Sequence, residues 1–79
     1  MHVLFFAQLK DATGCDSIEI ELSSPQNCEQ LWKFLIENFP ALAHHQKNTR
    51  LARNWEYVDA ETVFVNEDEV ALIPPVSGG

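Results

Sequence analysis

Seventy-nine residues, of which 46% are hydrophobic, can fill one modest core, so we expect a single domain spanning residues 1–79. Twelve acidic residues against five basic ones give a formal net charge of −7, which argues against nucleic acid and anionic membranes as partners. Cys15 and Cys28 lack metal-ligand spacing and the density of a disulfide scaffold, and the sequence shows no signal-peptide pattern or membrane-spanning run. We therefore expect free thiols and a cytoplasmic protein.

The first apolar run, residues 2–9, alternates as a strand whose two faces are both largely apolar. Such a strand is either central and covered on both sides, or it exposes one face to a partner. Residues 10–16 are rich in turn formers and predict a hairpin connection in which Gly14 takes a positive φ. Residues 17–22 alternate cleanly and predict a half-exposed antiparallel strand.

A helix is predicted from Asn27 to Pro40. Asn27 is a good N-cap, and Gln30, three residues later, completes a pair that resembles a capping box. Pro40 cannot continue a helix. Apolar side chains recur at three- and four-residue steps along one face: Cys28, Leu31, Trp32, Leu35 and Phe39. At this spacing we expect Trp32 in the core.

The second half of the chain is less regular. Residues 41–48 are ambiguous between a short helix and a turn, and their adjacent His44 and His45 cannot share a face, which favours a solvated pair over a metal site. A third strand is predicted within residues 51–58, with one side formed by Leu51, Arg53, Trp55 and Tyr57. The remaining segments are predicted as a short strand or packed turn over 59–65, an acidic turn over 66–69 and a last strand over 70–73.

This order of elements indicates an α+β fold, the ubiquitin-like β-grasp, with a mixed sheet of four to five strands and one main helix packed on one face. A last strand that follows a helical crossover can lie parallel to the first strand at the centre of the sheet. Strands in that position are covered on both faces, which explains why residues 2–9 and 70–73 are both so apolar.

The last strand leads into a segment of two prolines and two glycines: Pro74, Pro75, Val76, Ser77, Gly78 and Gly79. Prolines stop a strand and favour a stiff extended segment, whereas glycines let a partner's walls close around the backbone. We therefore expect residues 74–79 to form an extended, flexible-tipped tail that carries the Gly79 carboxylate. Because the sequence has no nucleophile motif, phosphate loop or metal-ligand cluster, we expect no catalysis by this chain alone and no bound metal.

The opening Val3-Leu4-Phe5-Phe6-Ala7-Gln8, Gly14, and Asp68-Glu69-Val70-Ala71 followed by the tail resemble the small, sulfur-carrier subunit of molybdopterin synthase over the whole chain. The resemblance implies that a ubiquitin-activating-like adenylyltransferase uses ATP to convert the Gly79 carboxylate into an acyl-adenylate. A sulfur donor system would then form a thiocarboxylate. The large, catalytic subunit would take in the tail and transfer the sulfur to cyclic pyranopterin monophosphate, giving molybdopterin within a heterotetramer. The carrier itself would bind no cofactor.

The same resemblance implies docking through the apolar sheet face opposite the helix. By period two, Val3, Phe5, Ala7, Val70 and Leu72 should face the helix, leaving Leu4, Phe6, Ala71 and Ile73 outward. The residues expected in the docking patch are Phe6, Tyr57, Ala71 and Ile73. Many relatives have Gly where this chain has Glu67, so Asn66 is expected to supply a positive φ.

Three alternatives are open at this point. A Gly-Gly ending also fits the sulfur carrier of another, thiamin-type pathway or a ubiquitin-like protein modifier. A plain interaction domain with an inert ending is the third reading. The double proline, Pro74-Pro75, favours the molybdopterin synthase subunit.

Overall fold

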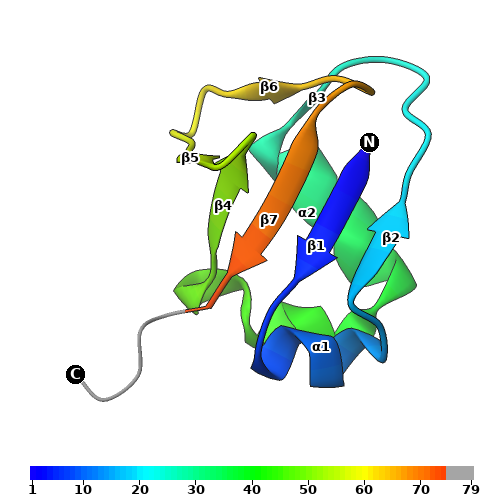
Figure 1. Cartoon of the computed structure of the whole chain (residues 1–79), viewed down its shortest axis with the longest axis vertical. Coiled ribbons are helices and arrows are strands. Elements are labelled where there is room, and N and C mark those ends of the chain that lie inside the picture. Colours follow the sequence, from blue (N-terminus) through cyan, green and yellow to red (C-terminus); the bar gives the residue numbers. More distant parts are fainter. Residues whose placement is uncertain (75–79) are drawn as a thin grey trace.

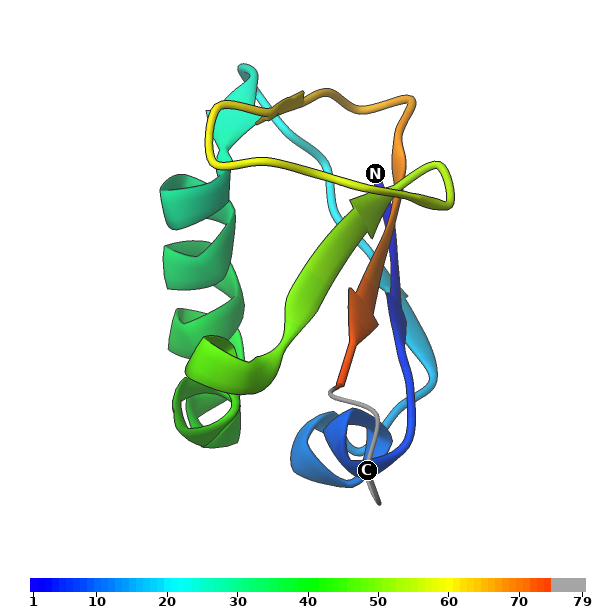
Figure 2. The same ribbon diagram turned by 90° about the vertical axis from the view of Figure 1, so that its left-hand side faces the viewer.

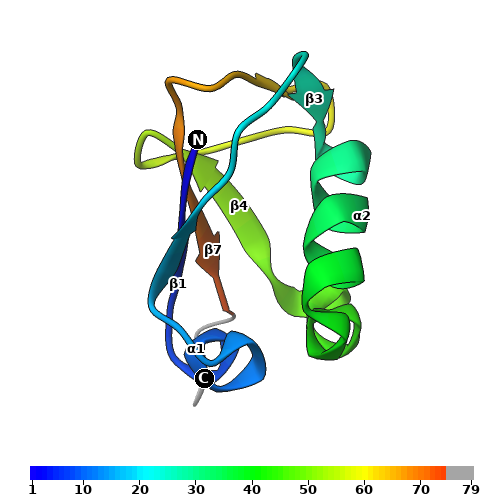
Figure 3. The ribbon, with the colours of Figure 1, turned by 90° about the vertical axis from the view of Figure 1, so that its right-hand side faces the viewer.

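The computed structural model describes residues 1–74, and its centre is a five-stranded sheet in the order β2-β1-β7-β4-β5 (Figure 1). These strands are β1 His2–Phe5, β2 Ser17–Glu19, β4 Arg50–Arg53, β5 Glu56–Tyr57 and β7 Glu69–Ile73. The helix α2, Cys28–Asn38, covers one face of the sheet and forms a separate layer in Figures 2 and 3. The architecture is the predicted α+β β-grasp, a mixed sheet with one main helix.

Strand β7 lies at the centre of the sheet, parallel to β1 and antiparallel to β4. Val70 and Leu72 on its inner face are fully buried beneath α2. Their position confirms the prediction that the last strand is central and runs parallel to the first. It also places the C-terminal end of β7 between two neighbouring strands, so the backbone leading to the tail is held from both sides.

The connection between β1 and β2 is a helix and not the predicted hairpin loop. Helix α1, Gln8–Thr13, follows Ala7, whose φ of 50° and ψ of −128° turn the chain out of the strand predicted over residues 2–9. Tertiary burial explains the difference, because the helical turn places Leu9 fully inside the core. Gly14 ends the helix with a φ of 78°, so its predicted positive φ is confirmed in a different setting.

Strand β2 is regular only over the first half of the predicted range 17–22, although the Ile20 N–H still donates to the Met1 carbonyl at 2.8 Å. Beyond it, Leu22 pairs with a side chain. The Leu22 N–H donates to Asn66 Oδ1 at 2.6 Å, and Asn66 Nδ2 donates to the Leu22 carbonyl at 2.7 Å. Asn66 is not among the residues with a positive φ, so that prediction was wrong. Its amide instead replaces a strand partner.

The predicted third strand is in fact a tight hairpin of β4 and β5. Asn54 and Trp55 form its two-residue turn, with φ values of 52° and 70°. The turn reverses the chain, so Tyr57 pairs with Ala52 on the face opposite α2. The four side chains expected on one side are therefore divided, with Leu51 and Arg53 on the inner face of β4, Trp55 in the turn and Tyr57 on the outer face.

Helix α2 begins as predicted. The Asn27 side chain accepts from the Gln30 N–H at 2.8 Å, and the Gln30 side chain accepts from the Asn27 N–H at 2.9 Å, which completes the capping box. Trp32 is buried in the core, as expected. The segment that follows forms two 3₁₀ helices, η1 Pro40–His44 and η2 Gln46–Asn48. Beside the start of α2, β3 (Gln26–Asn27) pairs with β6 (Val63–Phe64).

Within residues 1–74, no helix is long and apolar enough to span a bilayer. The core lies between the sheet and α2 and is closed at one end by α1 and η1. Its fully buried side chains are those of Val3, Phe5, Leu9, Leu31, Leu35, Leu42, Phe64, Val70 and Leu72.

Candidate docking face

The face of the sheet opposite α2, called the outer face below, is apolar across its central strands. The registers place Leu4 of β1 and Ala52 of β4 on either side of Ala71 in β7. Arg50 lies beside Ile73 at the end of β7 that leads to the tail. The pairing assigns the side chains of Leu4, Arg50, Ala52, Tyr57, Ala71 and Ile73 to this face, together with the polar side chains of His2, Ser17, Glu19 and Glu69 toward its other end. Phe6 follows β1, and its ring contacts the ring of Trp55. The structure thus brings the four predicted docking residues onto one surface.

These four residues are not equally accessible. Phe6 is 36% exposed and Tyr57 is 55% exposed, which is unusual for aromatic side chains of a small domain. Ile73 is half-buried, whereas Ala71 is only 2% exposed. Ala71 points outward as predicted, but it lies beneath its neighbours and forms the floor of the face. A partner would meet the rings around it first.

The side chain of Trp55 accounts for the burial of Ala71. It follows the end of β4 that lies beside Glu69, yet its ring centroid is 6.4 Å from that of Phe6, which follows the opposite end of β1. A contact between these two rings has to cross the outer face of β7. The indole therefore lies over the sheet, which explains why Ala52 and Ala71 are each 2% exposed while Trp55 itself is 64% exposed.

Arg50 is held on the same face by Tyr57. Its guanidinium carbon lies 3.8 Å from the centroid of the Tyr57 ring, the geometry of a cation–π contact. Stacking fixes the plane of the guanidinium while leaving its N–H groups directed outward. The charge is therefore presented at a defined place, next to Ile73.

The tail begins immediately beyond this face. Ile73 ends β7, and Pro74, which is half-buried, is the last residue that the structure describes. Pro75, Val76, Ser77, Gly78 and Gly79, all predicted tail residues, lie outside the described residues. The structure therefore describes only where the tail starts, which is the C-terminal end of the central strand β7.

Polar pairs lie at the margins of the sheet. His2 Nδ1 and Glu19 Oε1 contact each other across β1 and β2, and Lys10 Nζ lies 3.3 Å from Asp16 Oδ1 between α1 and the start of β2. The side chain of His2 is partly exposed and those of Glu19, Lys10 and Asp16 are exposed. Ion pairs between such exposed side chains contribute little to stability. The charged rim frames the apolar centre, as in many protein interfaces.

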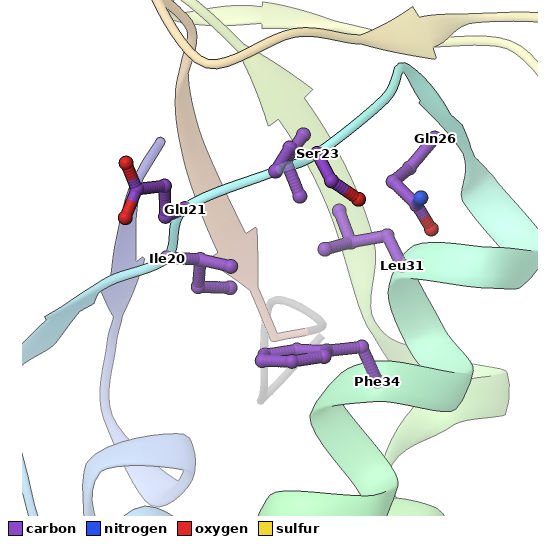
Figure 4. A pocket seen from close by; sticks show the side chains of 7 residues that line it. Ile20, Glu21, Ser23, Gln26, Leu31 and Phe34 are labelled. Atoms are coloured by element: carbon purple, nitrogen blue, oxygen red, sulfur yellow. The ribbon is translucent and has the colours of Figure 1, made fainter.

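The surface of residues 1–74 has several hollows. The one shown in Figure 4 has a volume of about 200 Å³, smaller than typical ligand pockets of roughly 300–1,000 Å³. It lies between the β2–β3 connection and α2, where Leu31 and Phe34 form an apolar wall and Glu21 points away from them. Across residues 1–74, no group of three His, Cys, Asp or Glu side chains is placed to hold a metal ion.

Cys28 lies at the other edge of α2, where its Sγ contacts the Asp59 carbonyl at 3.5 Å. Burial raises the pKa of this thiol, and the nearby Asp59 carboxylate raises it further. A thiol with a raised pKa is a weaker nucleophile at neutral pH, because the thiolate is the reactive form.

The chain is similar to known proteins over its whole length. The family described as the "ThiS family" matches residues 3–79. A curated relative from Chlamydomonas reinhardtii, named molybdopterin synthase sulfur carrier subunit, is 39% identical over 81 residues that cover 100% of this chain and 98% of the relative. Among solved structures, SAMP1 from Haloferax volcanii has a TM-score of 0.81 at 24% identity, covering 99% of this chain and 97% of that protein.

A further solved structure is a protein–protein complex of subunits 1 and 2 of the molybdopterin-converting factor from Helicobacter pylori. The matching chain of that complex has a TM-score of 0.68 at 22% identity, covering 99% of this chain and 96% of its own length. The two structural similarities are below 25% identity and establish the fold.

The sequence reasoning missed two members of the outer face, Trp55 and Arg50. Trp55 was predicted to lie within the strand of residues 51–58. The pair Asn54-Trp55 lacks the glycine that marks two-residue hairpin turns, so the local sequence did not indicate the turn. Arg50 preceded the predicted strand, and nothing in its local sequence indicates that it stacks on Tyr57.

Proposed function

The chain belongs to the ThiS family, and from this premise we propose that it is the sulfur-carrier subunit of a molybdopterin synthase. Its Gly79 carboxylate is adenylated by a ubiquitin-activating-like enzyme and then converted to a thiocarboxylate. This group donates sulfur to cyclic pyranopterin monophosphate in the large subunit. The curated relative of the same name, matched over the full length of this chain, is the observation that carries the proposal.

The chemistry requires activation because a carboxylate is a poor electrophile. Attack of the Gly79 carboxylate on the α-phosphorus of ATP releases pyrophosphate and makes AMP the leaving group. A sulfur nucleophile from the donor system then takes the place of AMP at the glycine carbonyl. The chain supplies the reacting carboxylate and the surface that delivers it, while ATP and catalysis belong to the partners.

The fold supports delivery of the tail. The apolar outer face is continuous with the end of β7, so a protein bound to Phe6, Tyr57 and Ile73 would lie next to the start of the tail. Because β7 is paired on both sides, the tail leaves from a fixed point. The large subunit is the proposed partner, and the H. pylori complex supports this because it holds the two subunits together. Two carriers and two large subunits would form a heterotetramer in the cytoplasm.

Intact-mass spectrometry tests the chemical step. The protein is incubated with its activating enzyme, ATP and a sulfur source, and a gain equal to exchange of one oxygen for sulfur is expected. Reactions without ATP, or with a chain lacking Gly79, serve as controls and should show no gain. Failure of the complete reaction to add sulfur would refute a sulfur-carrier role.

A second step identifies the pathway. The charged carrier is mixed with the large subunit and cyclic pyranopterin monophosphate, and molybdopterin is measured by fluorescence of its oxidised derivative. We expect loss of the added sulfur from the carrier together with the appearance of molybdopterin. A carrier that becomes charged but never discharges into this precursor would belong to another pathway.

A further inference from the structure

Trp55 occupies a backbone position that ordinarily selects glycine. Two-residue hairpin turns with positive φ at both central residues are of type I′ and favour Asn-Gly, because glycine has no Cβ to clash. Here the pair is Asn54-Trp55, with φ values of 52° and 70°. A bulky aromatic residue in this region is strained, and such strain persists at sites where the side chain serves a function.

The indole is positioned as well as exposed. Its ring contacts Phe6 across the outer face at a centroid separation of 6.4 Å, with the ring planes tilted by 58°. It remains 64% exposed, the largest exposed fraction among the large hydrophobic side chains of residues 1–74. An aromatic ring already held in one place loses little conformational freedom when a partner covers it.

Arg50 gives the same face a single positive charge. Lys10, Lys33 and Lys47 lie on α1, α2 and η2, and Arg53 is an inner-face residue whose Nη1 donates to the Val63 carbonyl at 2.9 Å. Of the five Lys and Arg residues, only Arg50 lies on the outer face. Among the described residues, its guanidinium forms no salt bridge with a carboxylate. In a chain of net charge −7, this is a strongly localised cation.

We propose that Trp55 and Arg50 form a two-point anchor that selects the large subunit by its surface chemistry. The inference rests on the proposed function. The partner offers an apolar slot that receives the indole and, next to the entrance for the tail, a carboxylate that accepts two N–H groups of Arg50. Trp and Arg are the residues most enriched at interface hot spots, and a guanidinium fork matches a carboxylate in geometry.

The position of the anchor explains how it would aid sulfur transfer. Arg50 pairs with Ile73 on the β4 side of β7, whereas the Trp55 indole contacts Phe6, which follows β1 on the other side of β7. Contacts on both sides of β7 would fix its direction relative to the partner, so the tail is aimed into the large subunit. Phe6 and Tyr57 support the anchor by holding its two side chains in place.

Calorimetric titration of the intact chain with the large subunit of its own synthase tests the anchor. Trp55→Gly and Arg50→Gln should each raise Kd about tenfold or more. Phe34→Ala, an exposed aromatic residue of α2, and Lys33→Gln, with the same loss of charge, are matched controls that should change Kd less than about twofold. The dependence of Kd on salt should weaken in Arg50→Gln but not in Lys33→Gln.

Thermal melting separates recognition from folding. Because glycine suits the turn, Trp55→Gly should melt no lower than the wild-type chain although it binds more weakly. If this variant melts lower in proportion to its loss of binding, Trp55 is a structural residue and the anchor is refuted. Sedimentation of the isolated chain adds a further check, because self-association lost in both variants would assign the face to a second copy and overturn the proposal.

The same measurements can refute the anchor without refuting the proposed function. A wild-type chain that binds the large subunit and discharges its sulfur, with both variants binding equally well, would refute the anchor and leave the carrier function intact. A wild-type chain that neither binds nor discharges would refute both. Loss of affinity in both variants with unchanged sulfur charging by the activating enzyme supports an anchor specific to the large subunit.

Discussion

Asn66 connects two segments that lie 44 residues apart, and its removal should destabilise the fold measurably. Its side-chain amide accepts from the Leu22 N–H at 2.6 Å and donates to the Leu22 carbonyl at 2.7 Å. The two hydrogen bonds join the segment that follows β2 to the turn before β7. We therefore expect Asn66→Ala to loosen one corner of the sheet.

The expected magnitude follows from the exposure of this bridge. A hydrogen bond contributes roughly 0.5–1.5 kcal/mol net, and the lower half of this range applies because water can reach Leu22 and Asn66. Loss of both bonds should reduce the free energy of unfolding by about 1.5 kcal/mol. In a domain of this size, that corresponds to a fall in Tm of roughly 6–12 °C.

Urea denaturation followed by the fluorescence of buried Trp32 measures the effect. Asn48→Ala removes an exposed amide whose recorded hydrogen bond within residues 1–74 is made by its backbone N–H, and its midpoint should stay close to wild type. Asn66→Gly tests the reason for the effect. A residue selected for a positive φ would be improved by glycine, whereas a bridging amide would be lost as in Asn66→Ala. An increase in stability for Asn66→Gly would refute the bridge.

Three further changes have defined outcomes. Ala7→Gly should raise the free energy of unfolding by about 1 kcal/mol in urea denaturation, because glycine relieves the strain of a φ of 50° and a ψ of −128°; a decrease would contradict the described backbone. In a Cys15→Ser chain, the alkylation rate of Cys28 should rise with pH at a higher midpoint in the folded than in the urea-unfolded protein, because burial and then Asp59 raise its pKa. Since that raised pKa favours the protonated thiol in the folded state, the stability contributed by Cys28 should be present below the unfolded pKa and decrease as pH rises through the folded pKa. Deletion of Gly79 should abolish sulfur transfer while changing Tm by less than about 2 °C, and a larger fall would show that the tail supports the fold.

Local signals predicted those parts of the fold whose structure depends on neighbouring residues. The Asn27–Gln30 capping box is a four-residue pattern, and it formed as expected. Period-two alternation also assigned Val70 and Leu72 to the buried face of β7. These features need no knowledge of what lies across the core.

The errors occurred where distant contacts decide the local conformation. Leu9 ends the apolar run that was predicted as a strand, and its burial in the core accompanies a helix there instead. Asparagine tolerates a positive φ, but the side chain of Asn66 instead forms hydrogen bonds with the N–H and the carbonyl of Leu22, which lies far away in the sequence. Trp55 contradicts the preference for glycine in its turn, so a rule based on propensity could not place it.

The positions of some candidate docking residues could also be predicted. Ile73 lies on the outer face of β7, as alternation predicts, and Phe6, which follows β1, contacts the Trp55 ring. The burial of Ala71 could not be foreseen, because it depends on a ring contributed by the turn between β4 and β5. The stacking of Arg50 on Tyr57 likewise depends on the register of that hairpin. A shift by one residue would move Tyr57 to the other face of the sheet and abolish the stacking.

The central position of β7 also determines how the domain responds to a mechanical pull on its C-terminal end. β1 lies near the N-terminus and runs parallel to β7, so opposed forces on the two ends slide these strands past each other along their length. The ladder joins β7 to each neighbour through four register pairs, and its hydrogen bonds lie across the direction of force. The bonds therefore share the load and do not open one at a time. A pull on the C-terminal end of β7 therefore acts on the sheet in its most resistant direction.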